Sequence, residues 1–280
     1  MRSFLLLIRY KVSFLLSLSS FTGFVLYSHQ ITAELWYMFA GVYLLASSAT
    51  VINQIQESKF DALMDRTHLR PIPSGTTTVK IASMYAFILL VFGAVMLFIF
   101  GGVIPLILGL LNIFWYNLIY TKLKRISAFA VVPGGLTGMI PPMIGYTAAG
   151  GHIFDYSILL FALFVFLWLV PHFWLLMNRY RMDYKNAGFP VISDTFYPKT
   201  FRIVTLSWML ASIFSIIPMM FYGIINSVIF VSFFLIAFII YFIINYFKSD
   251  SYIYSKSTLV LYNVFMLLLN VILIFDNLYK

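Results

Sequence analysis

The chain has 280 residues, 62% of them hydrophobic and only 10% charged, with a mean hydropathy of +0.96 and a formal net charge of +9. Soluble globular domains carry about 25% charged residues, so this composition excludes that class and indicates a polytopic membrane protein. The chain has no cysteine, which excludes disulfides, thiolate metal sites and a cysteine nucleophile. The basic charge requires no nucleic acid as a partner, because basic loops facing an anionic leaflet account for it.

Apolar runs of about 20 residues predict nine membrane spans. In chain order they are 12–28, 35–56, 79–99, 103–120, 127–148, 155–178, 201–222, 225–247 and 257–276. The first run has a basic flank, but Ser19-Ser20-Phe21 offers no small-residue cleavage site, so we interpret it as a retained helix and not as a signal peptide. The expected fold is all-α, with residues 1–280 forming a single integral-membrane domain.

The loops between these spans differ sharply in charge. Every Lys and Arg except Lys280 falls in one set of alternate loops or in their flanks. The positive-inside rule therefore places the N-terminus and these loops in the cytoplasm, and nine spans place the C-terminus outside. We expect a multi-pass protein of the plasma (inner) membrane, embedded in the lipid bilayer.

Polar residues recur every four positions where the second span ends. Asn53, Glu57 and Asp61 lie on one stripe of a helix at this spacing, and Arg66 and Arg70 repeat the step further along. Mg²⁺ takes carboxylate and phosphate oxygens, and the planar fork of Arg binds phosphate oxygens two at a time. We expect the carboxylates, in the cytoplasmic loop region after the second span, to hold a Mg²⁺-diphosphate together with the two arginines.

A solvated helix face with ion pairs is the alternative interpretation of this pattern, and it is the usual one in soluble proteins. Ionisable groups at the end of a membrane span favour the functional interpretation, because they are costly there. A second acidic loop follows the sixth span and carries Asp183 and Asp194. Two acidic loops four spans apart suggest that two halves of the chain contribute to one site.

Four short motifs follow one another between Asn53 and Pro190. They read N-x3-E-x3-D-A-x-M-x-R-T-x2-R-P from position 53, Y-T-K-L-K-R at 120–125, G-M-I-P-P-M-I-G-Y at 138–146, and P-H-F-W at 171–174 followed by D-Y-x2-A-G-F-P at 183–190. In this order they resemble the motifs of the UbiA-type intramembrane prenyltransferases, and among these the heme O synthases (protoheme IX farnesyltransferases).

The resemblance implies a bundle of about nine helices around a central cavity, with cytoplasmic cap loops that hold Mg²⁺ and diphosphate. It implies transfer of a farnesyl group from farnesyl diphosphate to a vinyl carbon of heme B, with heme B as a substrate and not a cofactor. Water then completes the side chain of heme O. Downstream partners would be heme-modifying or oxidase-assembly proteins.

The resemblance also assigns roles to residues. The catalytic set is Asn53, Glu57, Asp61, Asp183 and Tyr184, of which Glu57, Asp61 and Asp183 are the metal ligands. The diphosphate-binding set is Arg66, Arg70, Lys122, Lys124 and Arg125, and the acceptor-binding set is His172 and Trp174. The sequence departs from the family pattern at Thr50, Gln54, Glu57 and Ala187; the last stands where the family places a second aspartate.

Other interpretations stay open at this point. His172 could ligate heme iron or orient a propionate, or it could be a hydrogen-bonded packing residue. The abundant aromatic residues could stabilise an allylic cation, although most of them fill the bundle and its interface belts. The rival functions are a sister prenyltransferase acting on an aromatic quinone precursor and a membrane transporter.

Overall fold

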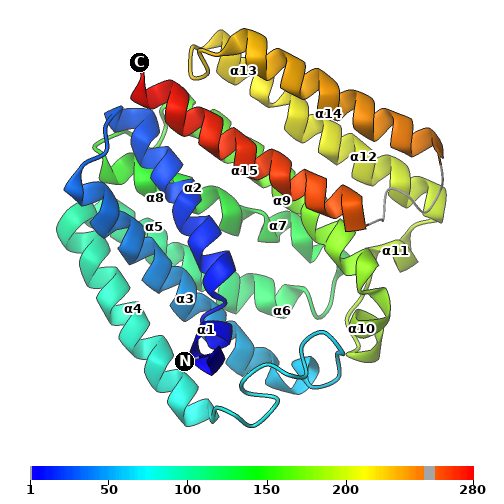
Figure 1. Cartoon of the computed structure of the whole chain (residues 1–280). Coiled ribbons are helices and arrows are strands. Elements are labelled where there is room, and N and C mark those ends of the chain that lie inside the picture. Colours follow the sequence, from blue (N-terminus) through cyan, green and yellow to red (C-terminus); the bar gives the residue numbers. More distant parts are fainter. Residues whose placement is uncertain (1, 249–255) are drawn as a thin grey trace.

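The computed structural model describes residues 2–248 and 256–280, and these ranges form a helical bundle (Figure 1). The helices are α1 (Arg2–Leu7), α2 (Tyr10–Ser28), α3 (Ala33–Asp61), α4 (Val79–Gly101), α5 (Val103–Phe114), the π-helix η1 (Trp115–Tyr120), α6 (Thr121–Leu123), the 3₁₀ turn η2 (Ala128–Ala130), α7 (Val131–Gly134), α8 (Leu136–Ala148), α9 (Tyr156–Arg179), α10 (Arg181–Asn186), α11 (Ile192–Thr195), α12 (Pro198–Phe214), α13 (Ile216–Phe221), α14 (Val228–Lys248) and α15 (Lys256–Leu278).

Within the described residues, eight helical segments are long and apolar enough to cross a membrane. The apolar part of α14, Val228–Ile244, is shorter, so the predicted count of nine spans is not confirmed, although each predicted span coincides with a helical segment. Three of the segments are interrupted: 103–123 contains η1, 128–148 contains η2 and the break between α7 and α8, and 198–221 contains the break between α12 and α13. Large apolar side chains such as Phe87 and Phe92 of α4 are exposed on the outside, as expected for a surface that faces lipid.

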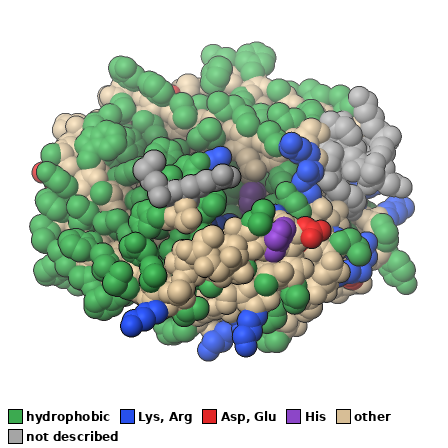
Figure 2. Space-filling model, turned by 60° about the horizontal axis from the view of Figure 1, so that its bottom comes forward, with side chains coloured by type: hydrophobic (Ala, Val, Ile, Leu, Met, Phe, Trp, Pro, Cys, Tyr) green, Lys and Arg blue, Asp and Glu red, His purple; other side chains and the backbone are tan. Residues whose placement is uncertain are grey.

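The order of the helices places particular loops at the same end of the bundle. α3 packs against α2 and α4, α8 packs against α2, α5 and α9, and α15 lies along α2 and α9. The segments 62–78, 124–127 and 180–197 therefore come together, and we call this region the polar end. Figure 2 looks onto this end, where Lys and Arg side chains are scattered around a hollow.

Close backbone contact fixes α2 against α8. A Cβ atom on Gly145 would lie 1.7 Å from the Ser20 carbonyl oxygen, and one on Gly23 would lie 2.0 Å from the Pro142 carbonyl oxygen. Small residues allow such approach between membrane helices, where van der Waals packing holds the bundle together. The motif G-M-I-P-P-M-I-G-Y thus serves helix packing at Gly145 and Pro142.

The second span is longer than its apolar run predicted. α3 continues to Asp61, so Glu57 and Asp61 lie inside the helix and are 5% and 3% exposed, and not in a loop. The helix continues because basic side chains from other segments neutralise these carboxylates, which a search for apolar runs does not detect.

Candidate active site

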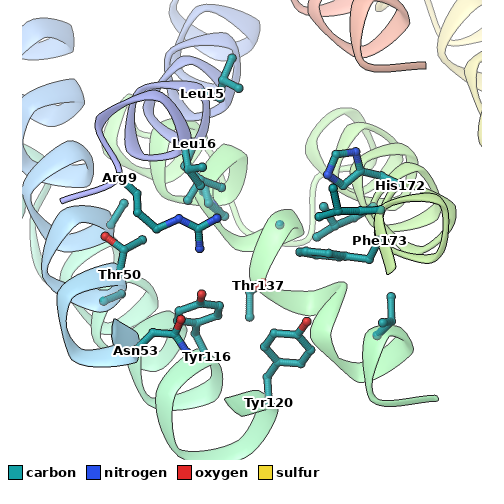
Figure 3. Close-up of a pocket in the computed structure, with 18 of the residues that line it drawn as sticks. Arg9, Leu15, Leu16, Thr50, Asn53, Tyr116, Tyr120, Thr137, His172 and Phe173 are labelled. Carbon is teal, nitrogen blue, oxygen red and sulfur yellow. The ribbon is translucent and has the colours of Figure 1, made fainter. Parts of the chain in front are cut away.

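A cavity of about 440 Å³ lies inside the bundle, and it has a charged region and an apolar region (Figure 3). The charged region is lined by Arg9, Asn53, Glu57, Asp61, Arg66, Arg70 and Lys124. The apolar region is lined mainly by aliphatic and aromatic side chains, including Val42, Leu45, Ile144, Val165, Trp168 and Phe173. This volume lies in the range of small-molecule sites, about 300–1,000 Å³.

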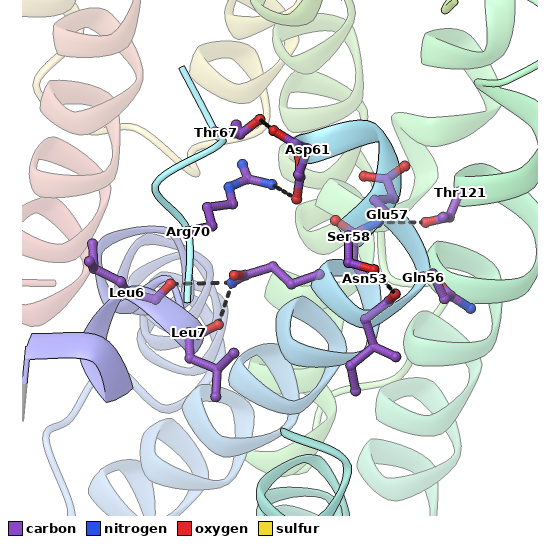
Figure 4. A network of polar contacts seen from close by, with 12 residues as sticks. Leu6, Leu7, Asn53, Gln56, Glu57, Ser58, Asp61, Thr67, Arg70 and Thr121 are labelled. Carbon is purple, nitrogen blue, oxygen red and sulfur yellow. Dashed lines mark hydrogen bonds and ion pairs between the residues drawn. The ribbon is translucent and has the colours of Figure 1, made fainter. Parts of the chain in front are cut away.

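The predicted stripe of α3 lines the cavity. Asn53 donates through Nδ2 to Thr121 Oγ1 at 3.1 Å (Figure 4). Lys124 Nζ lies 2.7 Å from the Glu57 carboxylate. The π-helix η1 leads directly into the segment that carries Thr121 and Lys124, so the motif at 120–125 meets α3 at the charged region.

Asp61 pairs with Arg70 at the same region. Arg70 Nη1 donates to Asp61 Oδ2 at 2.6 Å, and Thr67 Oγ1 donates to the Asp61 backbone carbonyl at 3.0 Å. Burial lowers the pKa of the Arg70 guanidinium, the positive charge of Arg9 lowers it further, and the Asp61 carboxylate opposes both effects. Two buried carboxylates are therefore each neutralised by a cation of the chain itself.

The two acidic loops meet across the mouth of the cavity. Arg66 donates through its backbone N–H to Asp183 Oδ2 at 3.1 Å, and its guanidinium lies 5.0 Å from the centre of the Tyr180 ring. Beneath them Met64, Ala187 and Phe189 form a small buried apolar cluster, with Phe60 and Tyr184 packed against it. Tyr184 also lines the cavity. Ala187, which stands where the family pattern has an aspartate, thus packs in this apolar cluster.

Four residues of the predicted site lie outside the cavity lining, as far as the described residues show. Lys122 is exposed at the surface, and the Asp183 carboxylate accepts the hydrogen bond from the Arg66 backbone N–H. Arg125 donates to the Gln56 carbonyl at 2.9 Å and lies over the Phe60 ring at 4.9 Å. Trp174 is buried against Trp208, with ring centres 5.7 Å apart. The other acidic residue of the second loop, Asp194, pairs with Arg181 and Lys185.

Arg9 is one of the cavity residues that sequence reasoning missed. It stands between α1 and α2 in a left-handed conformation, with φ 46°, and lines the charged region opposite His172 and Phe173 (Figure 3). Side chains of α3 satisfy the carbonyls of the turn before it: Gln54 Nε2 donates to Leu6 and Leu7 at 3.2 and 2.6 Å (Figure 4). Thr50 Oγ1 donates to the Ile8 carbonyl at 3.0 Å.

Thr50 and Gln54, two of the positions where the sequence departs from the family pattern, therefore hold the turn that carries Arg9. Both positions depart from the family pattern, but that departure alone does not point to Arg9. Tyr116 and Tyr120 were also missed, and both line the cavity beside the charged region. Tyr120 is the first residue of the motif at 120–125, whereas nothing in the sequence distinguishes Tyr116 from the many other aromatic residues of the chain.

The donor set suits a divalent metal that arrives with a diphosphate. In the part of the chain that the structure describes, no three His, Cys, Asp or Glu residues gather as a metal cage. Glu57 and Asp61, one helical turn apart, supply two carboxylates on one wall of the cavity. Mg²⁺ commonly uses one or two protein carboxylates and completes its shell with substrate phosphates and water, so these residues fit it.

Comparison with known proteins agrees with this geometry. Residues 13–269 match the model of the UbiA prenyltransferase family. The protoheme IX farnesyltransferase of Geobacter sulfurreducens is 38% identical over 192 residues, which cover 69% of this chain and 71% of that protein. That of Aquifex aeolicus is 41% identical over 153 residues, which cover 54% of this chain and 52% of that protein.

Solved structures share the fold along the whole chain. A digeranylgeranylglyceryl phosphate synthase superposes with a TM-score of 0.80 at 18% identity, covering 100% of this chain and 99% of that one. A UbiA homologue from Archaeoglobus fulgidus bound to DMAPP and Mg²⁺ superposes with a TM-score of 0.77 at 14% identity, covering 99% of both chains. The chain belongs to the UbiA prenyltransferase family and is a multi-pass membrane prenyltransferase.

Proposed function

We propose that this chain transfers a farnesyl group from farnesyl diphosphate to a vinyl group of heme B and so produces heme O. The observation that carries the proposal is the pairing of Glu57 with Lys124 and of Asp61 with Arg70 at one end of a largely apolar cavity. The names of the relatives at 35–41% identity support the choice of donor and acceptor.

Substrate binding would exchange the partners of these ion pairs. Without substrate, each carboxylate neutralises one cation, so the buried charges are compensated. Glu57 and Asp61 would hold the metal of a bound metal-diphosphate, and Arg70 and Lys124 would then be free to bind phosphate oxygens. Arg66 and Arg9 add two further cations from the loop and from the α1–α2 turn.

The chemistry follows from this division of the cavity. The bound metal would neutralise the charge that develops on the leaving diphosphate. The bond between C1 of the farnesyl group and the diphosphate oxygen breaks, and the oxygen keeps the electron pair. The terminal vinyl carbon of the acceptor then bonds to C1, and water adds to the neighbouring carbon with loss of a proton.

The apolar walls protect the allylic cation until the acceptor reacts. Tyr116, Tyr120 and Phe173 border the region between the charged residues and His172, where their π-faces can stabilise positive charge (Figure 3). Asn53 lies one helical turn before Glu57 on the same wall and donates a hydrogen bond to Thr121. Of the two residues predicted to bind the acceptor, His172 lines the cavity and Trp174 does not, so the acceptor-binding part of the proposal rests on His172.

The direct test is turnover by the purified protein. Farnesyl diphosphate, heme B and Mg²⁺ should yield a porphyrin whose mass has increased by one farnesyl group and one water, and a chelator should abolish the product. Turnover of a hydroxybenzoate or naphthoate acceptor, with heme B left unchanged, would overturn the choice of acceptor and identify a quinone-pathway enzyme.

We also propose that the polar end faces the cytoplasm from the inner membrane, as its basic loops suggest. Reporter fusions at Gly75, in the loop 62–78, and at Gly151, at the start of the loop before α9, should report opposite compartments, with Gly75 inside. The reverse assignment would overturn the orientation.

A further inference from the structure

His172 is held by two side chains that the motif analysis did not single out. Its Nδ1 atom lies 2.7 Å from Oδ1 of Asn263 on α15, although 91 positions separate the two residues in the chain. Its ring stacks on Trp168, with centres 4.8 Å apart and planes inclined by 23°. All three residues line the cavity.

The supports of His172 are themselves anchored. Trp168 donates through Nε1 to the Tyr262 backbone carbonyl at 2.9 Å, and Tyr262 OH lies 2.9 Å from Ser212 Oγ. α9, α12 and α15 are therefore joined behind the imidazole. Trp168 fixes the ring plane of His172, and Asn263 fixes its Nδ1 atom. A side chain that only filled space would not require both.

The hydrogen bond to Asn263 selects the chemical form of the imidazole. A carboxamide oxygen can only accept, so the Nδ1 atom of His172 must carry the proton. In a neutral imidazole the Nε2 atom then has a free lone pair. Such a nitrogen can coordinate a metal ion, and it lies in a cavity whose opposite wall carries Arg9 and Asn53 (Figure 3).

We propose that Asn263 holds His172 in the Nδ1–H form so that Nε2 ligates the iron of a porphyrin acceptor. The inference rests on the proposed function for the identity of the acceptor, and it adds the iron as the recognised group. Asn263 is a positioning residue, because it acts through His172. The cavity would then distinguish an iron porphyrin from the same ring without metal.

The test compares binding of heme B and of metal-free protoporphyrin IX to the purified full-length protein. Wild type should shift the Soret band of heme B and bind it more tightly than the metal-free ring. His172→Ala and Asn263→Leu should bind heme B about tenfold more weakly, as loss of a ligand or of its orienting partner does. Binding of the metal-free ring should not change, and added imidazole should restore the Soret shift of His172→Ala.

Two matched variants sharpen the comparison. Asn263→Asp keeps an acceptor oxygen toward Nδ1 and should retain the Soret shift. Asn270→Leu changes an asparagine of the same helix and cavity that bonds Thr22 and not His172, and it should keep the preference for iron. Farnesyl diphosphate binding, measured on every variant, reports that the cavity is still folded.

Two outcomes separate the inference from the proposed function. If wild type makes heme O while His172→Ala and Asn263→Leu weaken both porphyrins equally, or leave the Soret band unchanged, ligation is overturned and the enzymatic proposal stands. If wild type makes no heme O but shows a Soret shift that depends on His172 and Asn263, ligation is supported and the proposed reaction fails.

Discussion

The backbone N–H of Arg66 donates to the Asp183 carboxylate at 3.1 Å and so joins two cap segments that lie 117 positions apart in the chain. If this bond is the role of Asp183, Asp183→Asn should retain most activity, because an amide oxygen accepts the same bond. Asp183→Leu should raise KM for farnesyl diphosphate about fivefold, since one hydrogen bond contributes about 1 kcal/mol. Steady-state kinetics over a range of Mg²⁺ concentrations checks both. Loss of activity in Asp183→Asn, with rescue by high Mg²⁺, would instead support the ligand role predicted from the resemblance.

Asp61 is buried and paired, so its replacement should affect stability as well as catalysis. Asp61→Asn leaves the Arg70 guanidinium without its counter-ion and should cost on the order of 3 kcal/mol of unfolding free energy. Activity should fall on the order of a hundredfold. The double variant Asp61→Asn with Arg70→Gln should recover thermal stability in detergent but not activity. Equal stability of the wild type and the single variant would contradict the buried pair.

Two arginines that the motifs group together should behave differently. Arg66 lines the cavity, whereas Arg125 bonds the Gln56 carbonyl and covers the Phe60 ring. Arg66→Lys should raise KM for farnesyl diphosphate several-fold, since lysine lacks the planar fork. Arg125→Lys should leave KM unchanged and lower the melting temperature. A larger increase in KM for Arg125→Lys than for Arg66→Lys would indicate that the diphosphate binds near Arg125, outside the cavity.

The contact between α2 and α8 leaves no room for a side chain at Gly145. Gly145→Ala places a Cβ atom against the Ser20 carbonyl, which belongs to backbone and cannot move aside, and it should cost about 3 kcal/mol. Gly109→Ala is the matched control, because the nearest atoms to its Cβ are the methyl ends of Leu45, Leu97 and Ile144, which can move aside. Thermal unfolding of both variants should show the larger loss for Gly145.

Gln54 should matter to substrate binding although it does not line the cavity. Gln54→Leu keeps the size of the side chain but removes both hydrogen bonds to the turn before Arg9. The freed turn should misplace the Arg9 guanidinium and raise KM for farnesyl diphosphate several-fold. Combining Gln54→Leu with Arg9→Met should add no further increase if both act through the same cation. Additive effects would assign Gln54 another role.

The sequence predicted those features that depend on local periodicity. Long apolar runs identified the helical segments, and the four-residue spacing placed Asn53, Glu57 and Asp61 on one wall of the cavity. The end of α3 was predicted too early, because its last turns are stabilised by Lys124 and Arg70 from elsewhere in the chain.

Features that depend on contacts between distant segments could not be read in this way. Arg9 fits the ordinary pattern of a basic flank to a span, and only the left-handed turn directs it into the cavity. Asn263 lies in an apolar helix with no motif, and its partner His172 comes from α9. Trp174 belongs to a motif but packs against Trp208, so membership of a motif did not by itself identify cavity residues.

The turn that carries Arg9 also bears on how the protein is made. The carbonyls of Leu6, Leu7 and Ile8 are satisfied by Gln54 and Thr50, which leave the ribosome only after α2 has been synthesised. The Leu6 and Ile8 carbonyls also accept hydrogen bonds from Arg9 N–H and Ser13 Oγ, but until α3 has inserted beside α2 the Leu7 carbonyl lacks its Gln54 donor and must stay in contact with water or lipid headgroups. The earliest part of the site to be translated is therefore completed only when the second long helix is in the membrane, which orders the assembly of the charged region during biogenesis.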